Sequence, residues 1–494
     1  MANGHPYHFN LVNEAHRVME EHGFQPEFPS EAMEELKGIL ATGRQKPAAG
    51  LKDLSGLPWS SIDNDTSRDL DQIEVAERLS DGRIRVMIGV ADVDSLVRRG
   101  GPLDHHAQSE TTSVYTGVKV FPMLPTELSE GMTSLNEGEE RAALVIEFAV
   151  DEMGNCTDGK ASLALVKNRA QLAYPSVGAW LEGQAAAPPK VAADRELAEQ
   201  LKLQDEAARR MLGARFQHGA LDLETIETRP VMLADQAVNI ERQLKNRATS
   251  LIEEFMVAAN GVIAKTLDAA GVASIRRIVR TPKRWDRIVE VAQGLGTTLP
   301  AQPDSKALND FLLQQKKIDP DHFPDLSLTV VKLMGPGEYV LVKPNEPSPG
   351  HFGLAVQDYT HSTAPNRRFP DVVTQRLLKA LFVQGPQPYS EGSLGSIAER
   401  CTLMEDAARK VEREMQKRIA AVVLHPRIGQ RFPAIVTGVN HYGTFVRTLE
   451  PHVEGMLMNA PKGRGALDVG DRLTVKLVAT DPERGFIDFE MNGH

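Results

Sequence analysis

The sequence predicts a multidomain α+β protein: a small helical module over residues 1–52, a central domain with a mixed sheet and surrounding helices over 53–424, and a five-stranded OB-type barrel over 425–494. Its 494 residues exceed what one ordinary hydrophobic core organises. Apolar residues follow helical spacing up to about residue 50 and strand patterns afterwards. After residue 425, short strand patterns punctuated by glycine take over.

The N-terminal module is predicted to contain two short helices separated by a turn at residues 28–30. Apolar residues recur at helical spacing on both sides of that turn: Leu11, Ala15, Val18 and Met19, then Met33, Leu36 and Leu40. Two such helices form either a helix-turn-helix module or an arm that packs on the rest of the protein. The sequence leaves both alternatives open.

The central domain begins with strand patterns and continues with helices. Residues 83–91 alternate and then become continuously apolar, as a strand entering a core does, and 142–150 form a second such run. The proline-punctuated segment 121–125 is predicted as loop, and the alanine- and proline-rich segment 185–189 as a surface connection. Helices are predicted over 240–270, 370–383 and 393–422.

The C-terminal segment shows five short strand patterns, near residues 430–438, 442–448, 453–458, 472–479 and 485–490. Five strands within about seventy residues predict a small OB-type barrel. Tyr442 and Phe445 are its candidate rings for base stacking, and the alternative is that one of them fills the barrel. We expect at least one exposed aromatic side chain.

Composition restricts the class of protein. A hydrophobic fraction of 41% and a charged fraction of 25% are typical of a soluble globular chain, and the net charge of −11 argues against non-specific coating of nucleic acid. The two cysteines, Cys156 and Cys401, lack metal-ligand spacing and indicate a reducing compartment. The sequence shows no signal-peptide pattern and no apolar run of membrane-spanning length. We therefore expect a cytoplasmic protein without membrane contact.

An acidic stretch, residues 61–72, is the strongest candidate for chemistry. Four carboxylates, on Asp63, Asp65, Asp69 and Asp71, fall within nine positions, and such carboxylates repel one another unless cations or protons lie between them. One interpretation is a solvated acidic loop. Another is a calcium-binding EF-hand loop, but Arg68 occupies the position where that loop requires glycine, and a strand pattern follows instead of a helix.

The third interpretation is a catalytic metal site. Asp69 and Asp71 lie two residues apart, so both side chains point the same way in an extended segment, and Asp63 can join them. Carboxylate oxygens are the ligands that Mg²⁺ prefers, with Mn²⁺ as a possible substitute. One or two such ions hold an attacking water and a leaving oxygen during phosphodiester hydrolysis.

A series of motifs then identifies a family resemblance. The segments 61–71 (SIDNDTSRDLD), 88–93 (IGVADV), 112–115 (TSVY), 122–125 (PMLP), 134–136 (SLN), 251–260 (LIEEFMVAAN), 351–354 (HFGL) and 363–371 (TAPNRRFPD) occur in this order. Together they resemble the ribonuclease II/ribonuclease R family, the RNB-domain exoribonucleases. The segment after residue 425 resembles the ribosomal-S-one type of OB domain that follows the catalytic domain in this family.

The resemblance implies an RNB catalytic domain over 53–424 and a monomeric, magnesium-dependent exoribonuclease. Such an enzyme hydrolyses single-stranded RNA processively from its 3′ end and releases nucleoside 5′-monophosphates. By residue, the resemblance assigns Asp63, Asp69 and Asp71 to the metal, with Asp71 also catalytic, and Arg367 to the phosphate at the scissile end.

The resemblance also implies RNA contacts. Tyr115 and Tyr174 match tyrosines that contact the terminal nucleotides, and Glu253 and Glu412 resemble glutamates at the end of the RNA channel. From the residues alone, Arg368 beside Arg367 makes a phosphate site at a predicted helix start, since Pro370 suits a first helical turn. The alternatives are a solvated basic turn for the arginines and a purely structural or solvated role for the glutamates.

Two departures from the family pattern affect the expected function. Gln72 stands where the family commonly has an aspartate, and an amide holds a metal-bound water without adding charge. This leaves a catalytically weak, RNA-binding regulator as the alternative function. The predicted helical module over 1–52 stands where the family carries cold-shock domains. We expect it to replace them, to leave the RNA entrance more open and to let the enzyme approach structured RNA.

Overall fold

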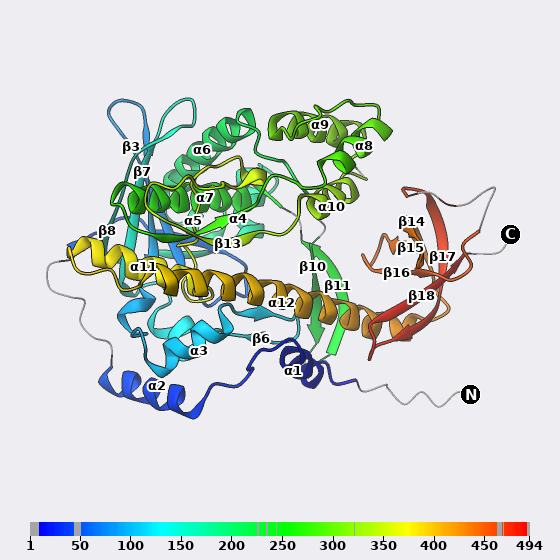
Figure 1. Ribbon diagram of the computed structural model, residues 1–494, viewed down its shortest axis with the longest axis horizontal. Coiled ribbons are helices and arrows are strands. Elements are labelled where there is room, and N and C mark those ends of the chain that lie inside the picture. The colour runs from blue at the N-terminus through cyan, green and yellow to red at the C-terminus, as the bar shows by residue number, and fades with distance from the viewer. Residues whose placement is uncertain are drawn as a thin grey trace.

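The computed structural model describes residues 9–43, 51–224, 227–233, 236–243, 245–320, 322–461, 467 and 469–491. Residues 1–8 and 44–50 of the predicted N-terminal module and 492–494 of the predicted barrel lie outside the described part. Figure 1 shows a central domain of sheet and helices, a long helix that crosses the molecule, and a small barrel at the end of that helix. No helix in the described residues is long and apolar enough to cross a membrane.

A mixed seven-stranded sheet forms the centre of the central domain, residues 51–424, with the strand order β1-β8-β7-β4-β3-β2-β9. Both edge pairs, β1 with β8 and β2 with β9, are parallel, and the other neighbours are antiparallel. The strands are β1 Lys52–Asp53, β2 Ser60–Asp63, β3 Gln72–Arg78, β4 Ile84–Ala91, β7 Glu140–Val150, β8 Cys156–Lys167 and β9 Ala170–Ala173. The strands predicted over 83–91 and 142–150 are therefore confirmed as β4 and β7.

The two faces of the sheet bury different side chains. Ile62, Ile88 and Phe148 belong to the main core, together with Leu201 and Phe255 from the helices that cover this face. The opposite face forms a smaller cluster around Trp59, Ile73 and Val75. Side chains along a strand alternate between faces, so β3 contributes Ile73 and Val75 to one cluster and Ala76 to the other.

Helices surround this sheet. Those of the central domain are α3 Pro102–Glu110, α4 Tyr174–Leu181, α5 Pro189–Ala192, α6 Arg195–Gln217, α7 Arg247–Ala269, α8 Trp285–Gly294, α9 Ser305–Ile318, α10 Phe323–Met334, α11 Phe369–Phe382 and α12 Glu391–Leu424. A π-helical segment occupies Glu127–Met132 and 3-10 turns occupy Val93–Ser95, Phe352–Leu354 and His425–Arg427. The predicted helices near 370–383 and 393–422 are confirmed.

The prediction of helix from residue 240 was wrong over its first turns. That segment is the end of strand β11 Gln236–Gln243, which forms a hairpin with β10 Glu227–Leu233. Helix α7 starts only at Arg247 because Asn246 caps it, with its side chain accepting from the backbone N–H groups of Ala248 and Thr249. The hairpin β5–β6 (Val114–Tyr115 and Val120–Phe121) was not predicted either. Nor was the antiparallel pair β12–β13 (Ser274–Ile278 and Glu338–Val342), whose strands are separated in sequence by helices α8 to α10.

Helices α1 Leu11–Glu21 and α2 Ser30–Thr42 confirm the two predicted N-terminal helices. They belong to different hydrophobic clusters: α1 packs on α12, and α2 packs on α3. Figure 1 shows them along the lower side of the central domain. Of the two open alternatives, the described helices therefore correspond to a packing arm.

The C-terminal barrel closes as β14-β15-β16-β18-β17 and confirms the five predicted strands. They are β14 Arg431–Asn440, β15 Gly443–Thr448, β16 Glu454–Leu457, β17 Arg472–Asp481 and β18 Phe486–Met491. The end of α12, including Leu424, packs into the barrel core. A second attachment lies on α10, where Asp325 pairs with Arg447 of the barrel through two contacts of 2.5 and 3.0 Å.

Candidate active site

The acidic stretch is a firmly held loop between β2 and β3. The backbone N–H of Leu70 donates to the Oγ of Ser134 at 2.9 Å, and the same hydroxyl donates to the carbonyl of Arg68 at 2.8 Å. Leu70 is also buried, with 1% of its surface exposed, and its carbonyl accepts from the N–H of Leu135. The interpretation as a freely solvated acidic loop is therefore wrong for its second half, whose backbone the segment around Ser134 fixes.

Asp71 is the most buried carboxylate of this loop, with 2% of its surface exposed. Its Oδ1 accepts from the backbone N–H of Asn366 at 2.9 Å, and its Oδ2 lies 3.4 Å from the Nε of Arg367. Burial raises the pKa of Asp71 to about 7; the nearby charge of Arg367 opposes that rise, and the charge of Asp69 adds to it. The structure thus joins two segments that sequence analysis selected independently.

Asp69 and Asp63 lie on the more open side of the loop and are both half-buried. Burial raises the pKa of Asp69, and the charge of Asp63 raises it further. The hydroxyl of Tyr115 donates to the Oδ2 of Asp69 at 3.4 Å. The Oδ1 of Asp63 accepts from the backbone N–H of Asn64 at 2.7 Å and from the hydroxyl of Ser67 at 2.9 Å. The three predicted metal ligands therefore lie within electrostatic reach of one another.

The arginine pair directly precedes helix α11, as predicted, with Pro370 in its first turn. The two side chains have different partners. Arg368 donates to Asp371 at 2.7 Å, and the same Asp371 oxygen accepts from the backbone N–H of Ala364. Because Asp371 is fully buried, this pair braces the turn from inside, and Arg367 is the arginine that faces the carboxylates.

Tyr115 connects the acidic loop, residues 61–72, to the long helix α12. Its backbone N–H donates to Glu412 at 3.1 Å, while its hydroxyl contacts Asp69 and 41% of its surface remains exposed. Burial raises the pKa of Glu412. Cys401, Met404 and Val411 form a buried seam on α12, and Glu412 follows it at the point of this contact. Glu412 therefore positions Tyr115 in this structure.

Tyr174 and Glu253 lie near the start of α4 and α7. Tyr174 begins α4, and burial followed by the charges of Asp63 and Glu74 raises the pKa of its hydroxyl. Glu253 is partly exposed and pairs with Lys245 at 3.2 Å. Its neighbour in the chain, Glu254, lies in a different environment.

Glu254 follows Glu253 directly on helix α7. Glu254 is 1% exposed and holds the guanidinium of Arg215 from inside the domain. A buried charge of this kind is tolerated because its partner is buried with it. Glu254 is therefore part of the core packing between α6 and α7.

The two candidate stacking residues of the barrel, Tyr442 and Phe445, differ in their exposure. Tyr442 is 76% exposed, with its ring 3.8 Å from that of His441, whereas Phe445 is half-buried. The expected exposed aromatic is confirmed in Tyr442. Its exposed face suits stacking on a base.

Sequence analysis missed the contributions of Asn366 and Ser134. Asn366 supplies the backbone donor to Asp71, and its side-chain oxygen accepts from the hydroxyl of Thr133 at 2.5 Å. Asn366 lies in the matched segment 363–371, but the segment itself did not indicate this contact. Ser134 lies in a motif that was matched, but nothing in the sequence indicated that its hydroxyl holds the loop at Leu70.

The donor set fits a hard divalent cation. Asp71 Oδ2 is buried without a hydrogen-bond donor, and the mutual repulsion of Asp63, Asp69 and Asp71 is what a bound cation would relieve. As the side chains stand, no group of three or more His, Cys, Asp or Glu in the described residues is gathered closely enough to hold a metal ion. Gln72, the first residue of β3, brings no charge to this set.

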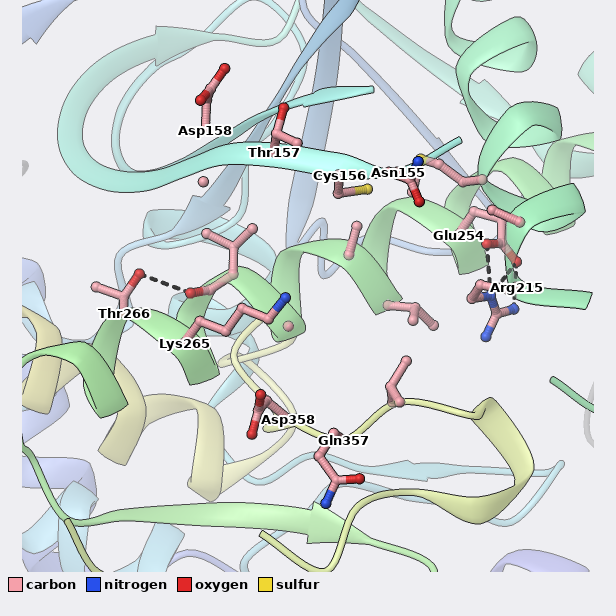
Figure 2. A pocket seen from close by; sticks show the side chains of 18 of the residues that line it. Asn155, Cys156, Thr157, Asp158, Arg215, Glu254, Lys265, Thr266, Gln357 and Asp358 are labelled. Atoms are coloured by element: carbon pink, nitrogen blue, oxygen red, sulfur yellow. Dashed lines mark hydrogen bonds and ion pairs between the residues drawn. The ribbon is translucent and has the colours of Figure 1, made fainter. Parts of the chain in front are cut away.

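A separate cavity of about 1060 Å³ lies between β8, α6, α7 and the segment 355–358. Figure 2 shows Cys156, the Arg215–Glu254 pair, Lys265 and Asp358 around it. None of the predicted site residues lines this cavity. Its charges of both signs single out no ligand class, so the acidic loop remains the candidate active site.

Comparison with known proteins gives the family. The model of the RNB domain matches residues 51–384, and that of the RNase II-type exonuclease C-terminal S1 domain matches 430–492. The chain is 29% identical to Ribonuclease R 1 of Lactococcus lactis over 94% of its own length and 59% of that protein. It is 30% identical to Ribonuclease R of Thermotoga maritima over 94% of its length and 68% of that protein.

A solved structure shows the same fold. Mycoplasma genitalium RNase R in complex with ribose-methylated single-stranded RNA superposes with a TM-score of 0.87 at 23% identity, covering 98% of this chain and 78% of that one. The chain spans about three fifths of the length of the first two curated relatives it matches, from Lactococcus lactis and Vibrio cholerae. The chain therefore belongs to the RNB-domain family and carries an RNase II-type C-terminal S1 domain.

Proposed function

We propose that this protein is a divalent-cation-dependent exoribonuclease that hydrolyses single-stranded RNA processively from its 3′ end and releases nucleoside 5′-monophosphates. The observation that carries the proposal is the position of Asp71 between Asp69, the backbone of Asn366 and the guanidinium of Arg367. The guanidinium of Arg367, which would bind the phosphate, thereby lies within contact distance of the carboxylates that would bind the metal ion. Hydrolysis of a phosphodiester requires both kinds of group at the same place.

Asp63, Asp69 and Asp71 would hold Mg²⁺, for which Mn²⁺ is a substitute. When bound, the cation supplies charge neutralisation and lowers the pKa of a water that attacks phosphorus. Without a bound cation, the close approach of these carboxylates is unfavourable, since burial and mutual repulsion raise the pKa values of Asp69 and Asp71. The charges of the acidic loop therefore favour the binding of a cation between these carboxylates.

Arg367 would bind the non-bridging oxygens of the scissile phosphate. Its side chain is 44% exposed while its Nε lies against Asp71, so the guanidinium has faces available to a phosphate. Negative charge grows on the phosphate oxygens in the transition state, and a fixed guanidinium stabilises that charge. Asn366 keeps Asp71 in place through its backbone, and Arg368 keeps the turn in place through Asp371.

The RNA would enter with its 3′ end toward this loop. Tyr115 offers an exposed ring beside Asp69, and Tyr174 lies close enough to Asp63 for that charge to act on its hydroxyl. Aromatic rings stack on bases without regard to sequence, which suits an enzyme that degrades many RNAs. Two relatives named Ribonuclease R and a similar structure solved with single-stranded RNA support this substrate class.

The alternative function is a catalytically weak RNA-binding regulator. The specific observation in its favour is Gln72, an uncharged residue at the start of β3 beside the catalytic loop. We favour the enzyme because Asp63, Asp69, Asp71 and Arg367 are all present around the loop. A cytoplasmic monomer is the state in which we propose that it acts.

Digestion of a 5′-labelled single-stranded RNA tests the proposal. With Mg²⁺ the enzyme should produce a one-nucleotide ladder that collapses to a short limit product, and a chelator should abolish it. Thin-layer chromatography of a uniformly labelled RNA should show nucleoside 5′-monophosphates. Binding of RNA without any shortening in Mg²⁺ or Mn²⁺ would establish the regulator instead.

A further inference from the structure

The segment 133–135 contacts both halves of the candidate site. On one side Ser134 holds the acidic loop: its hydroxyl accepts from the backbone N–H of Leu70 at 2.9 Å and donates to the carbonyl of Arg68 at 2.8 Å. The backbone N–H of Leu135 donates to the carbonyl of Leu70 at 3.0 Å. Both backbone groups of Leu70, the residue between two of the carboxylates, are therefore held by this one segment.

On the other side Thr133 holds the turn that carries Arg367. Its hydroxyl lies 2.5 Å from the side-chain oxygen of Asn366. The same hydroxyl lies 2.7 Å from the carbonyl of Leu128, but that carbonyl also accepts from the backbone N–H of Thr133 at 2.9 Å, so the hydroxyl hydrogen is available to Asn366. The amide nitrogen of Asn366 is buried without a partner in the described part of the chain. Thr133 is therefore the group that fixes this side chain.

These contacts close a ring, which consists of Leu70, Asp71, Asn366, Thr133 and Ser134. Asp71 follows Leu70 in the chain and accepts from the backbone N–H of Asn366. The side chain of Asn366 returns to Thr133, and the next residue, Ser134, returns to Leu70. All five residues are buried, with 5% or less of their surface exposed. Because a buried polar group is costly to leave without its partner, the ring resists opening at any one of its contacts.

Arg141 attaches the ring to the central sheet. This residue of β7 is 6% exposed, and its Nε donates to the carbonyl of Ser134 at 3.1 Å. A second nitrogen of its guanidinium donates to the carbonyl of Gly131, also at 3.1 Å. The planar guanidinium holds its donors in a fixed geometry, so it is a rigid support. A displacement of the segment 131–134 would therefore break contacts with the sheet.

We propose that Thr133 and Ser134 are positioning residues, whose hydroxyls set the separation between the carboxylates that would bind the cation and the guanidinium that would bind the phosphate. Ser134 acts through the backbone of Leu70, and Thr133 acts through Asn366. Hydrolysis depends steeply on such alignment, since a displacement of about 1 Å can lower a rate by roughly 100-fold. This inference rests on the proposed function, because it assumes that the loop binds a cation and that Arg367 binds the phosphate.

A purely structural role is the competing explanation. In that case the two hydroxyls stabilise the fold, and their removal leaves the hydrolysis rate unchanged at a temperature well below unfolding. Two substitutions separate the hydroxyl from the shape of the side chain. Thr133→Val keeps the shape and loses the hydroxyl, whereas Thr133→Ser keeps the hydroxyl and loses a methyl group. A positioning role follows the hydroxyl, and a packing role follows the shape.

Single-turnover hydrolysis of a saturating 5′-labelled RNA in Mg²⁺ measures the alignment. Thr133→Val should slow it by about tenfold to 100-fold, whereas Thr133→Ser should stay within about threefold of the wild type. The dissociation constant for the same RNA, measured in a chelator, should change by less than about threefold in both variants, because alignment acts on the chemical step. The matched control is Thr374→Val, whose rate should stay within about threefold of the wild type. Thr374 is also buried, but its hydroxyl donates to the carbonyl of Pro370 within its own helix.

Two further measurements test the ring itself. Ser134→Ala should also slow hydrolysis, and combined with Thr133→Val it should be at most about threefold slower than the slower single variant, because one break already opens the ring. Effects of the two substitutions that multiply would contradict the ring. Hydrogen exchange of the metal-free protein needs no activity. Thr133→Val should speed exchange in residues 363–371 as well as in residues 125–135, whereas a local structural role predicts a change only in the latter.

The outcomes distinguish this role from the proposed function. If Thr133→Val is as fast as Thr374→Val, or if Thr133→Ser is as slow as Thr133→Val, the positioning role is overturned and the exonuclease activity stands. Unchanged exchange in residues 363–371, or a loss of RNA affinity in place of a loss of rate, also overturns it. A wild type that degrades no RNA contradicts the proposed function, and the exchange measurement then decides whether Thr133 holds the turn. If Thr133→Val does not fold, Asn366→Leu, which breaks the same contact from the other side, takes its place.

Discussion

Arg367 lies against Asp71, with its Nε 3.4 Å from Oδ2, and the backbone N–H of the preceding Asn366 donates to Oδ1 at 2.9 Å. The turn that precedes helix α11 therefore contacts both oxygens of the Asp71 carboxylate. The guanidinium of Arg367 would bind the phosphate, and the carboxylate of Asp71 would bind the metal ion. The two groups therefore cannot move independently. This coupling makes the effects of changing either residue predictable.

Asp71→Asn should abolish hydrolysis and leave RNA binding largely intact. The substitution keeps the shape and the acceptor for the Asn366 N–H but removes the charge that attracts the cation. We expect a loss of at least about 100-fold in the rate of RNA shortening, measured on a 5′-labelled RNA, with a change of less than about threefold in the dissociation constant for RNA.

The matched control is Asp65→Asn. Asp65 lies in the same loop, but it is exposed and pairs with Arg229 at 3.4 Å, a surface contact worth little. The rate of this variant should stay within about threefold of the wild-type rate. If Asp71→Asn degrades RNA as fast as Asp65→Asn does, the enzymatic interpretation of the loop is wrong.

The pH dependence of hydrolysis should change when Arg367 is removed. Asp71 has a folded-state pKa of about 7, raised by burial, and must be ionised to bind a cation, so the rate should rise with pH through the neutral range. Arg367 lowers this pKa, so Arg367→Gln should move the rising limb to higher pH as well as slow the reaction by about 100-fold.

The measurement is a pH–rate profile at one fixed, subsaturating Mg²⁺ concentration. Arg367→Lys is the informative comparison, because it keeps the charge and loses the two-pronged hydrogen bonding of a guanidinium. Its rising limb should stay near that of the wild type while its rate falls. If the rising limb of the Arg367→Gln profile lies at the same pH as that of the wild type, Asp71 does not control the pH dependence.

Local patterns were enough to predict much of this fold and site. Pro370 after two arginines predicted the start of α11, and glycine spacing after residue 425 predicted the barrel strands. The alternation of Asp69, Leu70 and Asp71 also agrees with their positions: Leu70 is buried against the Ser134 segment and both carboxylates lie on the site. Each of these signals acts between neighbours in the chain, where spacing and burial are linked directly.

What the sequence did not reveal depends on contacts between distant segments. The contact of Asn366 with Asp71 joins residues 295 apart, and that of Tyr115 with Glu412 joins residues 297 apart. The burial of Glu254 could not be predicted either, because its partner, Arg215, comes from another helix. The N-terminal helices likewise could not be recognised as an arm, since only α3 and α12 show where their apolar faces pack.

Tyr442→Ala should weaken RNA binding without slowing hydrolysis of bound RNA. The ring is exposed on the barrel, away from any core, so its loss removes a stacking surface and no packing. We expect the dissociation constant for a long single-stranded RNA to rise about fivefold to tenfold, or about 1 to 1.4 kcal/mol. Single-turnover rates at saturating RNA should not change.

Tyr442→Phe keeps the ring and serves as the control, so it should bind RNA like the wild type. Retained binding in Tyr442→Ala would show that the exposed ring has no part in RNA contact. The barrel would then contribute through other groups or only through its attachment to the catalytic domain.

The attachment of the barrel depends on a charge pair between domains. Arg447 on β15 makes two contacts with Asp325 at the start of α10, and both side chains are largely buried. Arg447→Ala leaves the carboxylate of Asp325 without its partner, which should cost about 2 kcal/mol of the attachment. We expect faster proteolytic cleavage near residues 425–430 and weaker binding of long RNA, with hydrolysis of very short RNA unchanged.

The exchanged pair, Arg447→Asp with Asp325→Arg, should recover part of the protection against protease that each single substitution loses, because the opposite charges again face each other. Arg431→Ala, at an exposed arginine in the first strand of the same barrel, should leave protection unchanged. If the exchanged pair is cleaved as fast as Arg447→Ala, the attachment does not depend on this charge pair, and the packing of α12 in the barrel core must hold the two domains together.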